Sequence, residues 1–205
     1  FIKTKKINNK LKASFLVNSK IFNFNIHHTL EPYIENLSGV IAVLSIYFNL
    51  DKLDKNIFLD FRPTKGRGNI ATINISKNKV KLIDESYNSN PLSLKFSIEK
   101  FSSMDSNNQK KIVLLGDMLE LGKFSKRLHM EVPKIINKSD IDKVYVFGNF
   151  MKQAFNKIKT QKQGKIFETK KEINDFINTE IKENVHLMIK GSNSTGLNKI
   201  IKKYI

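Results

Sequence analysis

The pattern of apolar residues from Asn69 onward restricts the fold more than any other feature of this 205-residue chain. Short apolar runs, typical of strands buried on both faces, alternate with stretches whose apolar residues recur every three or four positions, as in amphipathic helices. The runs lie at 70–75, 80–83, 111–115, 144–147, 165–167 and 187–189. Strands that alternate with helices usually pair in parallel. The sequence therefore predicts an α/β fold with a doubly wound, mostly parallel sheet.

Helices are expected between these runs. The first begins at Pro91, because proline is favoured in the first turn of a helix. The others are expected around 128–136, 151–158, 173–181 and 197–204. Each carries apolar residues along one face, so each can cover the sheet with that face.

The N-terminal residues follow a different pattern. Alternating apolar residues at 15–17 and 21–26 predict two strands, joined by a hairpin turn at Asn18-Ser19. A long apolar helix is expected over 31–48 and a second, short helix over 51–58.

The segment from Arg62 to Gly68 is the best candidate for a domain boundary. It contains one proline and two glycines, and the apolar pattern changes after it. We therefore divide the chain into one domain over 1–64 and a second over 65–205.

The net charge of +17 would normally suggest a nucleic acid or an anionic membrane as the partner. Only Arg62, Arg67 and Arg127 are arginines, so 33 of the 36 basic residues are lysines. Arginine is the residue favoured for reading bases and for bidentate phosphate contacts. An excess made of lysine is more typical of a compositional habit, and we expect no nucleic-acid partner.

The absence of cysteine excludes disulfides, thiolate zinc sites and cysteine nucleophiles, and it fits a cytoplasmic protein. The longest apolar stretch, 40–50, is too short to span a bilayer, so no membrane insertion is expected. No signal peptide is visible. The chain begins at Phe1 rather than Met, and we expect it to be a piece of a longer protein.

Polar residues that could bind a ligand follow several of the expected strands. Ligands of open α/β sheets bind beyond the carboxyl ends of the strands. The segments concerned are 84–91, 116–122, 148–149 and 190–194. Each also has a purely structural interpretation: Asn90 and Ser192 can cap helices, and the carboxylates and Lys190 can simply be solvated.

No catalytic group stands out from the sequence alone. His27 and His28 are adjacent at the end of an expected strand, and because neighbouring side chains of a strand point to opposite faces, they are poorly placed to share a metal. We interpret them, and also His129 and His186, as structural. Neither a phosphate-binding P-loop nor a nucleophile elbow is present.

Taken together and in order, four segments of the chain resemble the C-terminal part of Mur ligases. They are Gly66-Arg67, the stretch from Leu82 to Pro91 (LIDESYNSNP), the stretch from Val113 to Gly122 (VLLGDMLELG), and the stretch from Ile189 to Ser192 (IKGS). His129 also matches a family histidine that lies a few residues beyond the glycine–aspartate loop.

The resemblance implies a larger enzyme than this chain. It makes residues 1–64 the end of a central ATP-binding domain and 65–205 a complete, Rossmann-like C-terminal domain. The domain that binds the UDP-sugar, the P-loop, the magnesium ligands and a carbamylated lysine lie upstream in the family. The chain by itself is therefore expected to be inactive.

The reaction implied is the ATP-dependent addition of D-alanyl-D-alanine to UDP-N-acetylmuramoyl-tripeptide, through an acyl phosphate, in peptidoglycan precursor synthesis. ATP, both substrates and Mg²⁺ are the implied ligands. The Tyr87-Asn88-x-Asn90-Pro91 segment favours this member over ligases that add diaminopimelate or extend folylpolyglutamate. A free-standing binding domain without activity, or a basic nucleic-acid-binding module, is the alternative of a different class.

The resemblance also assigns individual residues, though none as catalytic or as a metal ligand. It places Asn36 near the adenine, Arg67 at ATP, and one of Asp84 and Glu85 at the ribose. It places Tyr87 and Asn88 near the nucleotide. It places a second set, which again includes Asn88, near the incoming dipeptide: Asn88, Asn90, Asp117, Lys190 and Ser192. The chain has Asp-Glu where many relatives have Asp-Asp, Asn193 where many have arginine, and Leu30-Glu31-Pro32-Tyr33 in place of the family's Gly-x-His-Asn. The Gly66–Gly68 linker is the expected hinge.

Overall fold

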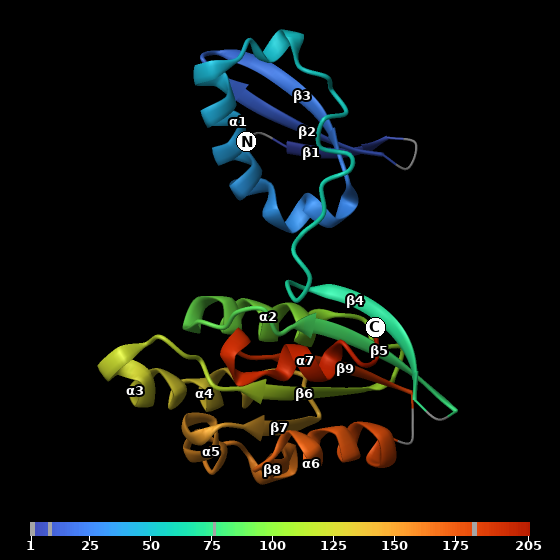
Figure 1. Ribbon diagram of the computed structural model, residues 1–205, viewed down its shortest axis with the longest axis vertical. Coiled ribbons are helices and arrows are strands. Elements are labelled where there is room, and N and C mark those ends of the chain that lie inside the picture. Colours follow the sequence, from blue (N-terminus) through green and yellow to red (C-terminus); the bar gives the residue numbers. More distant parts are fainter. Residues whose placement is uncertain (1–2, 8–9, 76, 182–183) are drawn as a thin grey trace. The chain divides into compact units, whose positions relative to one another are not determined.

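The computed structural model describes residues 3–7, 10–75, 77–181 and 184–205 (Figure 1). Contacts between residues divide the chain into two compact units, residues 1–64 (unit 1) and residues 65–205 (unit 2). Each unit has its own hydrophobic core.

Unit 1 is a three-stranded antiparallel sheet packed against a helix. Its strands are β1 (Lys3–Ile7), β2 (Lys10–Val17) and β3 (Lys20–Ile26), in the order β1-β2-β3. The predicted hairpin is confirmed: Asn18 and Ser19 both have positive φ, 47° and 63°, as tight hairpin turns require. The long helix is also present, as the 3₁₀ helix η1 (His28–Tyr33) followed by α1 (Ile34–Tyr47).

The prediction of a short helix over 51–58 is wrong. Only a 3₁₀ turn, η2 (Leu50–Lys52), forms there. Asp54 then accepts a hydrogen bond from the backbone N–H of Asn56, and the Lys55 carbonyl accepts one from Asn25 of β3. These bonds hold the backbone in a turn instead of a helix, because Asp side chains compete with helical hydrogen bonding.

Unit 2 contains a six-stranded sheet in the order β4-β5-β9-β6-β7-β8. The strands are β4 (Asn69–Ile75), β5 (Asn78–Glu85), β6 (Lys110–Gly116), β7 (Lys143–Phe147), β8 (Gln163–Phe167) and β9 (Val185–Lys190). All neighbouring pairs are parallel except β4 with β5, which form an antiparallel hairpin at one edge. The mostly parallel sheet that the sequence predicts is therefore confirmed.

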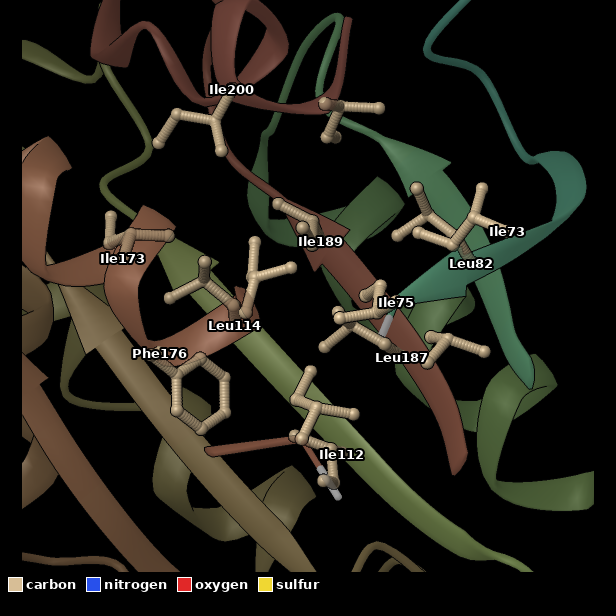
Figure 2. Close-up of a cluster of buried hydrophobic side chains, with 14 of the residues drawn as sticks. Ile73, Ile75, Leu82, Ile112, Leu114, Ile173, Phe176, Leu187, Ile189 and Ile200 are labelled. Atoms are coloured by element: carbon tan, nitrogen blue, oxygen red, sulfur yellow. The ribbon is translucent and has the colours of Figure 1, made fainter. Parts of the chain in front are cut away.

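Helices cover both faces of this sheet, as a doubly wound fold requires. One core joins the sheet to α2 (Pro91–Ser103), α4 (Val132–Ile136) and α5 (Asn149–Phe155). The other joins it to α6 (Lys170–Asp175), the π-helical segment η5 (Phe176–Glu180) and α7 (Leu197–Ile201). Figure 2 shows the second core, with Ile173, Phe176 and Ile200 over the strands. Of the described helices, none is both long and apolar enough to cross a membrane.

Two predicted helices differ in detail. The one expected over 128–136 is split into α3 (Ser125–His129) and α4, because Pro133 has no N–H to continue the hydrogen bonding of α3. The last helix ends at Ile201 rather than at 204. Three short 3₁₀ turns complete the unit: η3 (Gly122–Phe124), η4 (Thr160–Lys162) and η6 (Asn193–Thr195).

The surroundings of His186 predict that the free energy of unfolding of unit 2 depends on pH. The side chain is buried on β9 between Lys81 and Lys111 of the adjacent strands, and its Nδ1 makes no hydrogen bond to a described residue. Burial, and then the two lysines, lower the pKa of this imidazole. The unfolded chain therefore binds the proton more readily, and the free energy of unfolding should fall as the pH drops below about 6.5.

Urea unfolding of unit 2 between pH 5 and 8 measures this effect. His186→Phe, which keeps a planar ring and removes the titrating group, should flatten the profile over that window. An unchanged profile in the variant would show that other groups set the pH dependence.

Candidate functional site

The predicted ligand-binding segments of unit 2 follow the carboxyl ends of its parallel strands. The register places Glu85, the last residue of β5, beside Lys190, the last residue of β9. Leu115 of β6 lies on the other side of Lys190. The segments after these three strands therefore meet at one edge of the sheet.

Lys190 and Glu85 form a partly buried ion pair at this edge. The lysine is only 1% exposed, and its Nζ donates to Glu85 Oε2 at 3.5 Å and to the carbonyl of Asn88 at 3.2 Å. Burial lowers the pKa of Lys190, the Glu85 carboxylate opposes that shift, and Arg67 adds to it. A desolvated cation held this way can interact strongly with an anionic ligand.

The segment from Gly66 to Gly68 is held beside this ion pair. The Gly66 carbonyl accepts a hydrogen bond from the N–H of Tyr87 at 3.0 Å, and the Gly68 N–H donates to the Asp84 carbonyl at 2.8 Å. Both glycines have positive φ, and a Cβ on Gly66 would lie 2.9 Å from Tyr87 atoms. The Arg67 guanidinium consequently lies over the Tyr87 ring, 4.7 Å from its centre.

Asp84 and Glu85 point to opposite faces of β5, which separates the two carboxylates. Asp84 Oδ1 accepts hydrogen bonds from the backbone N–H and the hydroxyl of Ser86, at 3.0 and 2.6 Å. Asp84 thus fixes the turn after β5, while Glu85 faces Lys190.

Asn88 and Asn90 both make local hydrogen bonds. Asn88 Oδ1 accepts from the Ser89 N–H, and its side chain is exposed. Asn90 is the N-cap of α2, where its side chain and that of Ser93 form a reciprocal capping box. The capping role that the sequence allowed for Asn90 is therefore confirmed, and its predicted contact with substrate stays a prediction.

Asp117 and Ser192 are buried and bonded within the protein. Asp117 Oδ1 and Oδ2 accept from the N–H groups of Met151 and Phe150, in the first turn of α5. The Ser192 hydroxyl accepts from the Leu119 N–H at 2.8 Å and donates to the Ser89 carbonyl at 3.3 Å. Both side chains thus join strand-end segments to one another.

Gly148 is a residue whose importance the sequence did not show. It has a φ of 115° at the N-cap of α5, and a Cβ there would lie 2.5 to 2.7 Å from the Asp117 carboxyl group. The only available signal was its position directly after the apolar run of β7.

Unit 2 therefore brings together Arg67, Glu85, Tyr87, Asn88 and Lys190. Asn36 lies in unit 1, where its side chain is exposed on α1. In the described part of the chain, no group of three or more Asp, Glu or His residues is placed to hold a metal ion.

These features define an α/β domain whose functional groups lie at the carboxyl edge of a parallel sheet. A protein-family model, the glutamate ligase domain of Mur ligases, matches residues 69–193, which is more than half of the chain. The chain belongs to the Mur ligase family.

Two relatives of this chain carry the same enzyme name. UDP-N-acetylmuramoyl-tripeptide–D-alanyl-D-alanine ligase of Rickettsia prowazekii is 28% identical over 200 residues, which cover 98% of this chain and 43% of the relative. The ligase of that name from Buchnera aphidicola is 28% identical over 94% of this chain and 41% of its own length. The chain thus spans less than half the length of these relatives.

Solved structures show the same fold. A MurF from Acinetobacter baumannii superposes with a TM-score of 0.72 and 20% identity, over 98% of this chain and 44% of that one. A MurF ligase from Thermotoga maritima in complex with ADP gives 0.67 and 21%, over 98% and 44%.

Proposed function

We propose that this chain is the C-terminal part of a ligase that joins D-alanyl-D-alanine to UDP-N-acetylmuramoyl-tripeptide at the expense of ATP. The family match over 69–193 carries the proposal, and the names of the relatives supply the substrates. The ADP complex of the Thermotoga structure supports ATP as the nucleotide. We place the enzyme in the cytoplasm, where UDP-linked precursors are made.

Unit 2 would contribute the outer half of the nucleotide site and would bind the dipeptide. Arg67 and Lys190 supply positive charge for phosphate or carboxylate groups, and Glu85 supplies an acceptor for ribose hydroxyls or for an ammonium group. Of the two carboxylates at the end of β5, we assign the ligand contact to Glu85, because Asp84 is bonded to Ser86. Tyr87 presents a half-exposed ring, and Asn88 an exposed amide, beside these charges.

Asn90, Asp117 and Ser192 would act in substrate binding mainly through the backbone that they hold. Their side-chain acceptors are bonded to α2, to α5 and to the loop after β6. A carboxylate has further lone pairs, so Asp117 also offers one wall of a cavity of about 270 Å³, formed with Gly148 and Thr195 at the same sheet edge.

Unit 1 would be the end of the central ATP-binding domain, with Asn36 at the adenine. Its helix α1 exposes a row of large apolar side chains, with exposed fractions from 46% to 75%: Val40, Val43, Ile46 and Tyr47. An apolar row of this kind usually marks a surface that packs against further protein. We assign the P-loop and the Mg²⁺ ligands to the rest of that domain.

In the proposed reaction the tripeptide carboxylate takes the terminal phosphoryl group of ATP. ADP is left behind and an acyl phosphate forms. The dipeptide amine then attacks the acyl carbon, so that a C–N bond forms, the acyl C–O bond breaks, phosphate leaves with its oxygen and the amine loses a proton. The contribution of unit 2 is to orient the amine and to exclude water, which would otherwise hydrolyse the acyl phosphate. The Gly66–Gly68 linker stays our proposed hinge for that closure.

Rescue of bacterial cells depleted of their own D-alanyl-D-alanine-adding ligase tests this function. The full-length gene that encodes these residues should restore growth, and the same gene without residues 65–205 should not. Rescue of cells depleted of the diaminopimelate-adding ligase instead would favour the other family member. Failure of both, with tight salt-sensitive DNA binding, would favour a nucleic-acid-binding module.

A further inference from the structure

His129 makes two hydrogen bonds from a fully buried position. The Nε2 atom accepts from the backbone N–H of Met118 at 2.9 Å, and Nδ1 lies 2.7 Å from the carbonyl oxygen of Ser125. An N–H only donates and a carbonyl only accepts, so the ring carries its proton on Nδ1. One imidazole thus joins the loop after β6 to the start of α3.

The same ring also contacts α5. It stacks on Phe150 with a distance of 5.1 Å between ring centres, and the N–H of Phe150 donates to Asp117. The His129 Nε2 atom lies 3.8 Å from Asp117 Oδ1. His129 therefore holds Met118 by a direct hydrogen bond, and it packs against Phe150, whose N–H holds the preceding residue, Asp117.

The next peptide along the loop connects this histidine to the candidate site. The Leu119 N–H donates to the Ser192 hydroxyl, which in turn donates to the carbonyl of Ser89. Ser89 lies next to Asn88, whose carbonyl accepts from Lys190. Hydrogen bonds thus run from His129 through three strand-end segments to the buried lysine.

We propose that His129 is a positioning residue for the dipeptide, acting through the hydrogen bond that it accepts from Met118. The assignment to the dipeptide rests on the proposed function; the claim about the loop does not. Without that acceptor the loop after β6 is no longer held in one position. The hydrogen bond from Ser192 to Ser89, which orients Asn88, weakens as a result. If His129 served only to fill space, the ability of Nε2 to accept a hydrogen bond would not matter.

Two substitutions of nearly equal chemistry separate these roles. A glutamine at 129 reaches the position of Nε2 and can accept from Met118, whereas an asparagine reaches only the position of Nδ1 and can bond Ser125. His129→Asn should speed amide hydrogen exchange at Met118 and Leu119 by about tenfold, and His129→Gln should restore most of the protection. The amide of Val113, in the centre of β6, is the internal control for the fold.

Steady-state kinetics of the full-length ligase complete the test. His129→Asn should raise the KM for D-alanyl-D-alanine by about tenfold while the KM for ATP changes less than about twofold, and His129→Gln should reverse the effect. Equal exchange rates or equal kinetics in the two variants would overturn the proposal. A wild-type enzyme that forms no dipeptide product would overturn the proposed function instead, and the exchange comparison would still decide the claim about the loop.

Discussion

Replacing Gly148 by alanine is expected to lower the free energy of unfolding of unit 2 by about 2–4 kcal/mol. The backbone at this position has a φ of 115° and a ψ of 161°, a region that only glycine adopts readily. The added Cβ would lie within 2.7 Å of the Asp117 carboxyl group. Either α5 moves or Asp117 gives up its hydrogen bonds to the first turn of that helix.

Gly39→Ala is the matched control for this experiment. Gly39 lies within α1, and a Cβ added there would have no other atom within 4 Å among the described residues. Alanine should therefore stabilise unit 1 by about 0.5–1 kcal/mol, as expected in a helix. Denaturant unfolding followed by a probe in each unit measures both effects. Equal stability of wild type and Gly148→Ala in unit 2 would contradict the described packing of Gly148 on Asp117.

Replacing Lys190 by methionine is expected to lower kcat/KM of the full-length ligase by about a hundredfold or more. Methionine keeps most of the side-chain length but removes the buried cation. The Glu85 carboxylate and the Asn88 carbonyl would both lose their partner. The positive charge at the carboxyl ends of β5 and β9, where anionic groups are expected to bind, would then be reduced to that of Arg67, opposed by Glu85.

A double substitution separates this role from a purely structural one. Lys190→Met alone should also destabilise unit 2, because the Glu85 carboxylate loses Lys190 as its partner. Glu85→Gln together with Lys190→Met removes both charges and should recover most of that stability. We expect the double variant to have a much lower kcat/KM than Glu85→Gln alone, a variant that reports the loss of the Glu85 contact by itself. Recovered ligation in the double variant would show that Lys190 serves only to neutralise Glu85. Lys100→Met, on the exposed side of α2, is the control for loss of positive charge alone.

The sequence predicted the sheet well because its signals are local. Apolar runs such as 111–115 are determined by burial on both faces, and β6 forms over Lys110–Gly116. The errors occurred where hydrogen bonds or missing donors override periodicity. The turn at Asp54 replaced a predicted helix, and Pro133 split another.

The candidate site was predictable only in outline. The position of polar residues after strands predicted which segments meet, and parallel register then placed Glu85 beside Lys190. No sequence pattern showed that Asp117 and Ser192 would be bonded within the protein, or that Asp84 would turn to Ser86. The bonds of Asp117 and Ser192 depend on contacts between residues far apart in the chain, whereas the bond between Asp84 and Ser86 is set by the local turn after β5.

Ligation by the purified full-length enzyme tests the central proposal most directly. UDP-N-acetylmuramoyl-tripeptide and ATP would be supplied with D-alanyl-D-alanine, diaminopimelate or glutamate as the amine, and the products identified by mass spectrometry. We predict a pentapeptide product with the dipeptide alone, together with one phosphate released per product. A product with diaminopimelate or glutamate, and none with the dipeptide, would contradict the account.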